Sequence, residues 1–243
     1  IGATDEIDLT ATAVDLNGTL DVSGTSQFNA AVTLAGATPT LTIGDAGEED
    51  TKIVFDGNAQ DFHIGLDDSS DDLVIGLGST LGTTSHIVIN EAGIITKPLQ
   101  TYVYAYMNAD QTVDADDNNH NLNLNAELKD LNSDFNTTTY TFTAPVDGAY
   151  MCSAFIGMIE NTDANVTDWF FGFNASNGLD RGFGGNPSVH ETGSGSNYTK
   201  TVTFSKIVYM DANDTMTLIA DAYSGGSYTF KVDGSTGIYG ATS

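Results

Sequence analysis

Two clusters of acidic residues are the densest sets of metal-binding side chains in this sequence. Residues 67–72 contain four aspartates, and residues 114–119 contain Asp114, Asp116 and Asp117 followed by two asparagines. Carboxylate and amide oxygens are the ligands that Ca²⁺ prefers. The second cluster begins like an EF-hand loop, but Asn119 and Asn125 stand where that loop has Gly and Glu. We expect solvated acidic loops, with calcium at Asp114, Asp116 and Asp117 as the alternative.

Nucleophiles and acid–base pairs give no catalytic pattern. Paired carboxylates carry out glycoside hydrolysis, but with 33 acidic residues a suitable pair arises by chance. The four histidines lack metal-ligand spacing, and the single cysteine, Cys152, lies in an apolar run that predicts a buried, unreactive thiol. The sequence has no phosphate-binding loop, dinucleotide fingerprint or nucleophile elbow in a suitable context. We therefore expect no enzymatic activity.

Residues 168–198 form a segment of another kind, rich in aromatic, glycine and asparagine residues. Residues 169–173 predict a buried middle strand, and residues 174–197 predict loops. The segment holds the only tryptophan and the only arginine of the chain. Adaptable loops with an aromatic residue and an arginine are typical of binding surfaces. The residues expected to bind a receptor or ligand are Trp169, Arg181, Asn186, Asn197 and Tyr198.

The overall charge excludes several classes of partner. Seven basic and 33 acidic residues give a formal net charge of −26. Nucleic-acid binding needs a basic surface that releases counterions, so we exclude nucleic acid. Docking on an anionic bilayer is disfavoured for the same reason. No run of about 18 apolar residues is present, and we expect no membrane insertion.

The elements that must position these residues fall into two unlike halves. Residues 1–97 hold three aromatic residues and residues 98–243 hold the other 20. Pro98 marks the break, because it biases the preceding residue toward extended geometry. We expect three parts, namely a short β-repeat segment at 1–43, a second β-rich segment at 44–97, and a compact domain at 98–243.

The first half predicts short strands that cannot build a core alone. Pieces at 7–9, 19–22, 31–34 and 40–43 are separated by glycine turns, and residues 16–24 and 28–36 form a loose repeat. Longer β-branched runs follow at 51–57, 61–66, 72–77 and 86–90. Few aromatic residues and short strands bury little apolar surface. We infer an elongated homo-oligomer, most plausibly a trimer, whose copies share one narrow core.

The second half predicts an antiparallel sandwich or jelly roll. Apolar and polar residues alternate at 199–204, 216–221 and 228–233, and turns rich in Gly, Asn and Asp separate the runs. No stretch shows helical periodicity. The residues expected in the core are Phe142, Tyr150, Phe155, Val202, Phe204, Leu218 and Phe230.

Residues 142–150, with the sequence Phe-Thr-Ala-Pro-Val-Asp-Gly-Ala-Tyr, resemble the early strand pair of the C1q/tumour-necrosis-factor-like jelly roll. In that family the first aromatic enters the core, the Pro-x-x-Gly segment turns, and the tyrosine packs back. Residues 208–218 resemble a later strand pair, with Asn213-Asp214 at the family's Gly-Asp position, and residues 235–240 resemble its closing strand. The resemblance covers residues 99–243. It implies a ten-stranded, non-catalytic jelly roll that forms tight trimers, some of which calcium stabilises.

The N-terminal half resembles shaft segments of marine bacteriophage fibres, at residues 52–66 and 71–78. Together the two resemblances imply an all-β fold in which an elongated trimeric β-repeat shaft precedes a C1q-like knob. The expected protein is a homotrimeric fibre on the virion surface. Its knob would attach to a host-surface glycan or protein, and its N-terminal end would contact other virion proteins. A structural capsid or tail decoration protein and a fibre-borne glycan depolymerase remain as alternatives.

Overall fold

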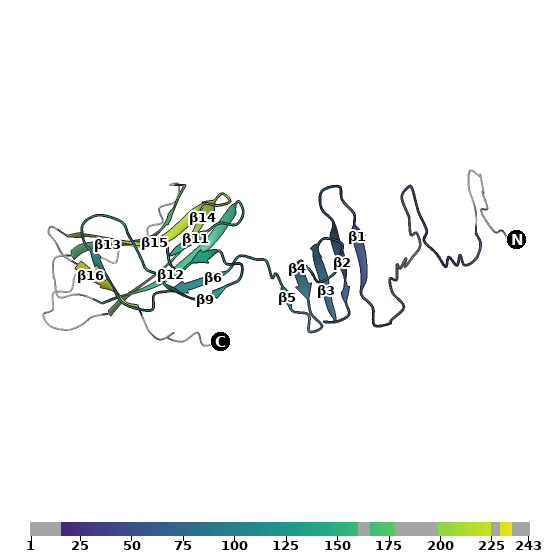
Figure 1. The fold of residues 1–243 in the computed structure, drawn as a ribbon, viewed down its shortest axis with the longest axis horizontal. Helices are drawn as coiled ribbons and strands as arrows, with labels where there is room; N and C mark the ends of the chain where they lie inside the picture. Colours follow the sequence, from purple (N-terminus) through teal and green to yellow (C-terminus); the bar gives the residue numbers. More distant parts are fainter. Residues whose placement is uncertain (1–15, 160–165, 178–198, 225–228, 235–243) are drawn as a thin grey trace. The chain divides into compact units, whose positions relative to one another are not determined.

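The chain is built of β-strands in a computed structural model (Figure 1). The structure describes residues 16–159, 166–177, 199–224 and 229–234, with the backbone alone at 159, 166–169, 199–200 and 223–224. These residues form sixteen strands and no helix. The described part of the chain therefore contains no helix long and apolar enough to cross a membrane.

The chain divides into two units, Ile1–Asp45 and Ala46–Ser243. In the described part of the first unit every residue is exposed and none lies in a strand. The strands expected at 19–22, 31–34 and 40–43 are therefore absent from the single chain, and the one expected at 7–9 lies outside the described residues. A strand is completed by hydrogen bonds to a neighbour, and these three pieces have no neighbouring strand within the described chain.

Residues 51–96 form a five-stranded antiparallel meander in which each strand pairs with the next (Figure 1). Its strands match the four predicted β-branched runs and add a short fifth strand. The first hairpin pairs Thr51 with Leu66, and the last pairing joins Ile89 to Ile95. The strands are β1 (Thr51–Phe55), β2 (Phe62–Asp67), β3 (Asp72–Leu77), β4 (Ser85–Ile89) and β5 (Ile95–Thr96).

The two faces of this meander differ in composition. Paired residues of antiparallel strands point to the same face, so the register assigns each side chain. We call the face that carries Ile53, Ile64 and Ile75 the front face, and the opposite one the back face. No residue of the front face is buried. On the back face His63, Gly65, Val74 and Gly76 are all buried.

Loop 78–84 closes the back face. His63 is 1% exposed, and its Nδ1 lies 2.8 Å from the carbonyl oxygen of Gly78. A Cβ atom on Gly76 would lie 2.6 Å from His63 Nε2, and one on Gly65 would lie 3.0 Å from Leu81 Cδ1. The two glycines therefore leave the room that the histidine ring and Leu81 occupy.

Residues 103–232 form an antiparallel sandwich (Figure 1). One sheet has the order β14-β12-β16-β7, and the other has the order β10-β11-β15-β13, with β8 also paired to β15. From β11 to β16 successive strands alternate between the two sheets, which is compatible with a jelly roll. The strands are β6 (Val103–Tyr106), β7 (Gln111–Asp114), β8 (His120–Asn121), β9 (Ala126–Asp130), β10 (Phe135–Asn136), β11 (Thr141–Thr143), β12 (Gly148–Ile159), β13 (Val166–Ala175), β14 (Thr199–Met210), β15 (Thr215–Ser224) and β16 (Thr229–Val232). Strands β6 and β9 form a separate pair.

One apolar core lies between the two sheets. Phe142, Val202, Leu218 and Phe230 are buried there as expected. Tyr150 and Phe204 are partly buried against it, and Phe204 lies across the sandwich from Phe173 with ring centroids 5.2 Å apart.

The core prediction for Phe155 is wrong, because that side chain is 73% exposed. Its neighbours Ala154 and Ile156 enter the core, and Phe155 faces outward, paired with Thr203. Strand β12 is apolar on both faces, so alternation could not tell the inner face from the outer one.

The hairpin at residues 142–150 has a specific geometry. The Phe142 and Tyr150 rings meet edge to face with centroids 5.4 Å apart. The Tyr150 hydroxyl donates a 2.6 Å hydrogen bond to the carbonyl oxygen of Val146, which braces the turn. Asp147 Oδ1 accepts a 2.7 Å hydrogen bond from the backbone amide of Ala212 in the neighbouring turn.

The turn at residues 211–214 explains the residue types found there. Asn213 has a φ of 73°, a left-handed conformation that favours Gly and tolerates Asn. The Asp214 carboxylate accepts hydrogen bonds from the Ser176 hydroxyl, the Asn177 side-chain amide and the Asp211 backbone amide. Asp214 thereby ties the β14–β15 turn to the end of β13.

Candidate functional site

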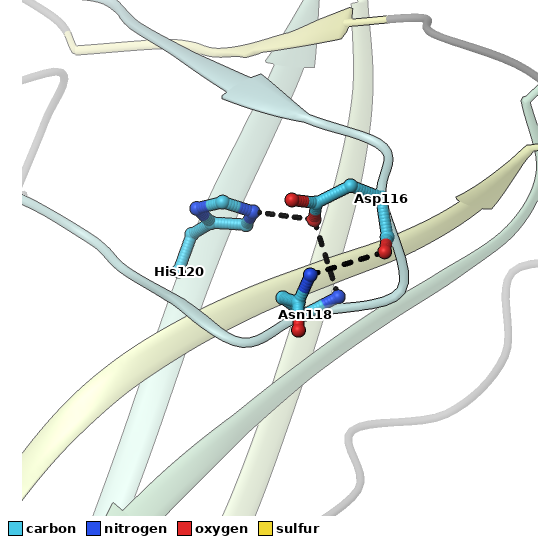
Figure 2. Close-up of polar contacts among 3 residues, drawn as sticks. All are labelled: Asp116, Asn118 and His120. Carbon is cyan, nitrogen blue, oxygen red and sulfur yellow. Dashed lines mark hydrogen bonds and ion pairs between the residues drawn. The ribbon is translucent and has the colours of Figure 1, made fainter.

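The loop between β7 and β8 holds a cluster of hydrogen-bonded polar side chains on the described sandwich surface. Ala115 is buried and anchors the loop, and Asp117 has a φ of 60° while its backbone amide donates to the carbonyl oxygen of Ala222. This left-handed turn brings Asp116 and His120 together. Figure 2 shows Asp116 Oδ1 2.8 Å from His120 Nε2, and 3.2 Å from the Asn118 backbone nitrogen, which donates to it.

The carboxylates around this loop have opposite electrostatic environments. The hydrogen bond from His120 and those from Asn118 hold the pKa of Asp116 below its ordinary value. Burial raises the pKa of Asp221 on β15, and the negative charges of Asp117 and Asp116 raise it further. Asp221 Oδ1 is a buried atom with no hydrogen-bond partner among the described residues. At neutral pH the charged form of Asp221 is therefore disfavoured by burial and by the neighbouring carboxylates.

The structure does not gather the expected calcium ligands into a cage. Asp114 lies at the end of β7, paired with Thr229, and Asp116 is engaged by His120. Within the described residues, no three His, Cys, Asp or Glu side chains converge as metal ligands would. In the other acidic cluster Asp67 Oδ1 accepts hydrogen bonds from the Ser69 amide and hydroxyl. These bonds stabilise a hairpin turn.

The expected receptor-binding residues are placed only in part. Trp169 belongs to β13, where its backbone pairs with Ala222, and its side chain lies outside what the structure describes. Arg181, Asn186, Asn197 and Tyr198 also lie outside the described residues. Strand β13 buries Phe171 and Phe173 as expected, but within the described sheet it lies at the edge rather than in the middle.

Cys152 behaves as a packing residue. Its thiol is partly buried against the core, 3.7 Å from the Met216 sulfur. Burial raises the pKa of the thiol to about 11. A thiol with this pKa carries almost no thiolate at neutral pH and is a poor nucleophile.

No protein family model matches the chain. No curated protein matches it either. The interpretation of the surface therefore depends on the physical features of the chain itself.

Sequence reasoning missed an exposed apolar surface on the sandwich. Four large side chains on the outer face of β12 and β14 are exposed, and Met151 reaches 80%. The register pairs Met151 with Ile207 and Ala149 with Tyr209. The signal that could have revealed it is the apolar run of β12, which is interrupted only by Ser153 and has apolar side chains on both faces of the strand. We call this surface the outer patch, and it consists of Met151, Phe155, Ile207 and Tyr209.

A shallow hollow lies beside the outer patch. It has a volume of about 330 Å³ and is lined by Gly148, Ala149, Asn177, Tyr209, Met210 and Asp211. None of its lining residues belongs to the Asp116 loop, so the carboxylates with shifted pKa values do not face this hollow. The described site thus offers apolar contact surface rather than an acid–base pair in a cleft.

Proposed function

We propose that this chain is a homotrimeric virion fibre protein whose C-terminal domain attaches the particle to a host-surface glycan or protein. The N-terminal segments serve as the shaft, and the sandwich serves as the knob. Attachment is multivalent, because three knobs on each fibre and several fibres on each particle raise the avidity of a weak single site.

One observation carries the oligomeric part of the proposal, namely the complete exposure of residues 16–45. A segment without a buried residue gains too little from burial to offset the entropy of ordering its backbone. Other copies of the chain can supply both the missing strand partners and the missing core. Eight large apolar side chains are exposed along it: Leu16, Leu20, Val22, Phe28, Val32, Leu34, Leu41 and Ile43.

The outer patch supports the same proposal for the sandwich. Soluble monomers rarely expose a contiguous apolar surface of more than a few hundred Å². Phe155 and Met151, which are 73% and 80% exposed, both lie on β12 there, on either side of Ser153. Contact between copies would remove them from water.

The position of the expected receptor segment supports attachment. Strand β13 ends at Ala175 and β14 begins at Thr199. The segment rich in Gly and Asn is therefore the connection between two long strands of a rigid sandwich. Connections of this kind commonly carry binding residues because the scaffold fixes both ends.

Light scattering of the purified protein, with and without EDTA, tests the assembly. A mass of three chains in both conditions is expected, because the described carboxylates form no metal cage. A trimer that dissociates in EDTA would indicate that the acidic loops bind a metal ion. A stable monomer would contradict the fibre proposal.

Attachment is tested by binding of the labelled full chain to a panel of marine bacterial isolates. Arg181→Ala should reduce binding to a responsive isolate, whereas Lys129→Ala, which removes a positive charge elsewhere, should not. Equal binding by both variants would contradict the role of residues 168–198. A reducing-end assay on host polysaccharide tests for depolymerase activity. Images of virions that show the knob packed on the shell would favour the alternative of a decoration protein.

A further inference from the structure

We propose that the front face of the β1–β5 meander packs against the same face of other copies of this chain and forms the core of the shaft. The inference depends on the homo-oligomer proposed above and identifies the surface by which its copies meet. It concerns residues 51–96, which are separate from the sandwich.

The front face is apolar in every cross-strand row. Eleven of its twelve residues are aliphatic or aromatic, the exception being Thr51 at one corner. The middle row places four isoleucines side by side on four strands. The rows are Thr51, Leu66, Leu73, Ile89 and Ile95; Ile53, Ile64, Ile75 and Ile87; and Phe55, Phe62 and Leu77.

The bulge between β3 and β4 extends this surface. His86 is the extra residue where the register shifts between Ile75 and Gly76. Its ring lies edge to face with Phe62, with centroids 6.0 Å apart. The apolar surface therefore ends in an aromatic pair rather than in a charged group.

The chain covers one face of the meander and leaves the other uncovered. On the back face, loop 78–84 lies over His63 and Gly65, and Leu81 is buried. On the front face, Phe55 is 61% exposed and Ile95 is 63% exposed. A sheet of three or more strands depends on a hydrophobic face for its stability, and the larger apolar face of this five-stranded sheet is the uncovered one.

The absence of charged side chains on the front face favours a second copy as the occupant. The chain carries −26, so copies repel one another over most of their surface. No Asp, Glu, Lys or Arg side chain lies on the front face, and the nearby carboxylates, such as Asp67 and Asp72, lie at strand ends in the hairpin turn. A charged partner would find nothing to pair with, whereas an identical neutral face removes apolar area from both chains.

The area of the front face is smaller than that of a typical stable interface, so the proposed assembly needs further contact surface. The five strands contain 24 residues in all. At about 3.3 Å per residue and about 4.8 Å between strands, they cover roughly 400 Å² in each copy. A stable interface buries about 800 Å² on each partner. The front face alone is therefore too small, and the exposed apolar side chains of residues 16–45 and of the outer patch offer further surface for contact between copies.

Thiol cross-linking within the assembled full chain tests the inference. In a Cys152→Ser background, Ile64→Cys places a thiol in the middle of the front face, and Ile75→Cys repeats the test on β3. Lys52→Cys is the matched control, because Lys52 is exposed on the back face. Packed sheets lie about 10 Å apart, so the probe is a bismaleimide of about that span.

The expected result is efficient covalent dimer formation by Ile64→Cys and Ile75→Cys and little by Lys52→Cys, with the native mass unchanged. A trimeric mass without cross-linking at either front position would overturn the inference but leave the homotrimer standing. Equal cross-linking at the control position would also overturn it. A monomeric mass would overturn the inference together with the proposed function.

Discussion

Individual residues of the sandwich surface show how a strongly acidic chain tolerates its charge. Asp116 is stabilised in its charged form by His120 and Asn118, whereas Asp221 is partly buried near two other carboxylates. The two aspartates contribute to stability with opposite signs. The folded state binds a proton at Asp221 more tightly than the unfolded state does, so its contribution falls as pH rises from about 3.9 through the folded pKa.

We predict that Asp221→Asn stabilises the protein at neutral pH. The amide carries no charge, so it avoids the cost of a carboxylate beside Asp117 and Asp116, and the gain should shrink as the pH approaches 3. Thermal denaturation at pH 7 and at pH 3 measures the difference. Asp114→Asn is the control for general relief of negative charge, since Asp114 is exposed on β7. Equal gains in the two variants, or a gain that does not depend on pH, would contradict the prediction.

At the scale of elements, the meander depends on two positions without side chains. A Cβ atom at Gly76 would lie 2.5 Å from the backbone oxygen of Thr84 and 2.6 Å from His63 Nε2. The first of these partners is backbone and cannot rotate away. Loop 78–84 would have to move off the back face.

We therefore predict that Gly76→Ala lowers the free energy of unfolding of the meander by about 1–3 kcal/mol, the usual cost of overpacking. Hydrogen exchange of the β2 and β3 amides measures it. The control is Gly148→Ala, because a Cβ atom there meets only Tyr150 Cε2 at 3.8 Å. Unchanged protection in Gly76→Ala would show that the loop adapts without cost.

The elements also show what the sequence could predict. The strands of the meander follow from β-branched runs between Asp and Gly turns, and they form where expected. The outward position of Phe155 could not be predicted, because both faces of β12 are apolar. The pieces at 19–22, 31–34 and 40–43 form no strands in the single chain, because they have no strand partners among the described residues.

Polar sites were predictable to a smaller extent. The pattern from Asp114 to Asn118 indicated a site of oxygen ligands. The actual partner of Asp116 is His120, and this contact depends on the left-handed backbone of Asp117. Spacing along the chain does not encode such a turn, because Asp adopts this conformation only as an occasional alternative.

At the scale of the whole molecule, repulsion between acidic copies must be offset by apolar contact. The outer patch and the front face are the two uncharged surfaces that the described part of residues 46–243 offers for it. Salt screens the repulsion between exposed charges but not the apolar attraction. A charge placed in either surface should therefore weaken the association of copies, because it would have to be desolvated in the apolar contact.

We predict that Phe155→Glu weakens the proposed homotrimer, because each interface would have to desolvate a carboxylate. A cost of about 3 kcal/mol raises the dissociation constant roughly a hundredfold. Light scattering across a dilution series measures it. Thr112→Glu adds the same charge to an exposed position on β7 of the same sheet and should leave the mass unchanged. Identical dilution curves for the two variants would exclude the outer patch from the interface.

The contrast in strand pairing has a consequence for biosynthesis. Each strand of the meander pairs with its neighbour in sequence, so the sheet can form as soon as residue 96 has left the ribosome. The sandwich cannot close until residue 232 has been made, because Gln111 on β7 pairs with Val232 on β16. Local pairings form faster than distant ones. Each nascent chain therefore exposes a complete apolar front face while its C-terminal domain is still being translated. This exposure favours association of the proposed kind between nascent chains on neighbouring ribosomes of one messenger RNA.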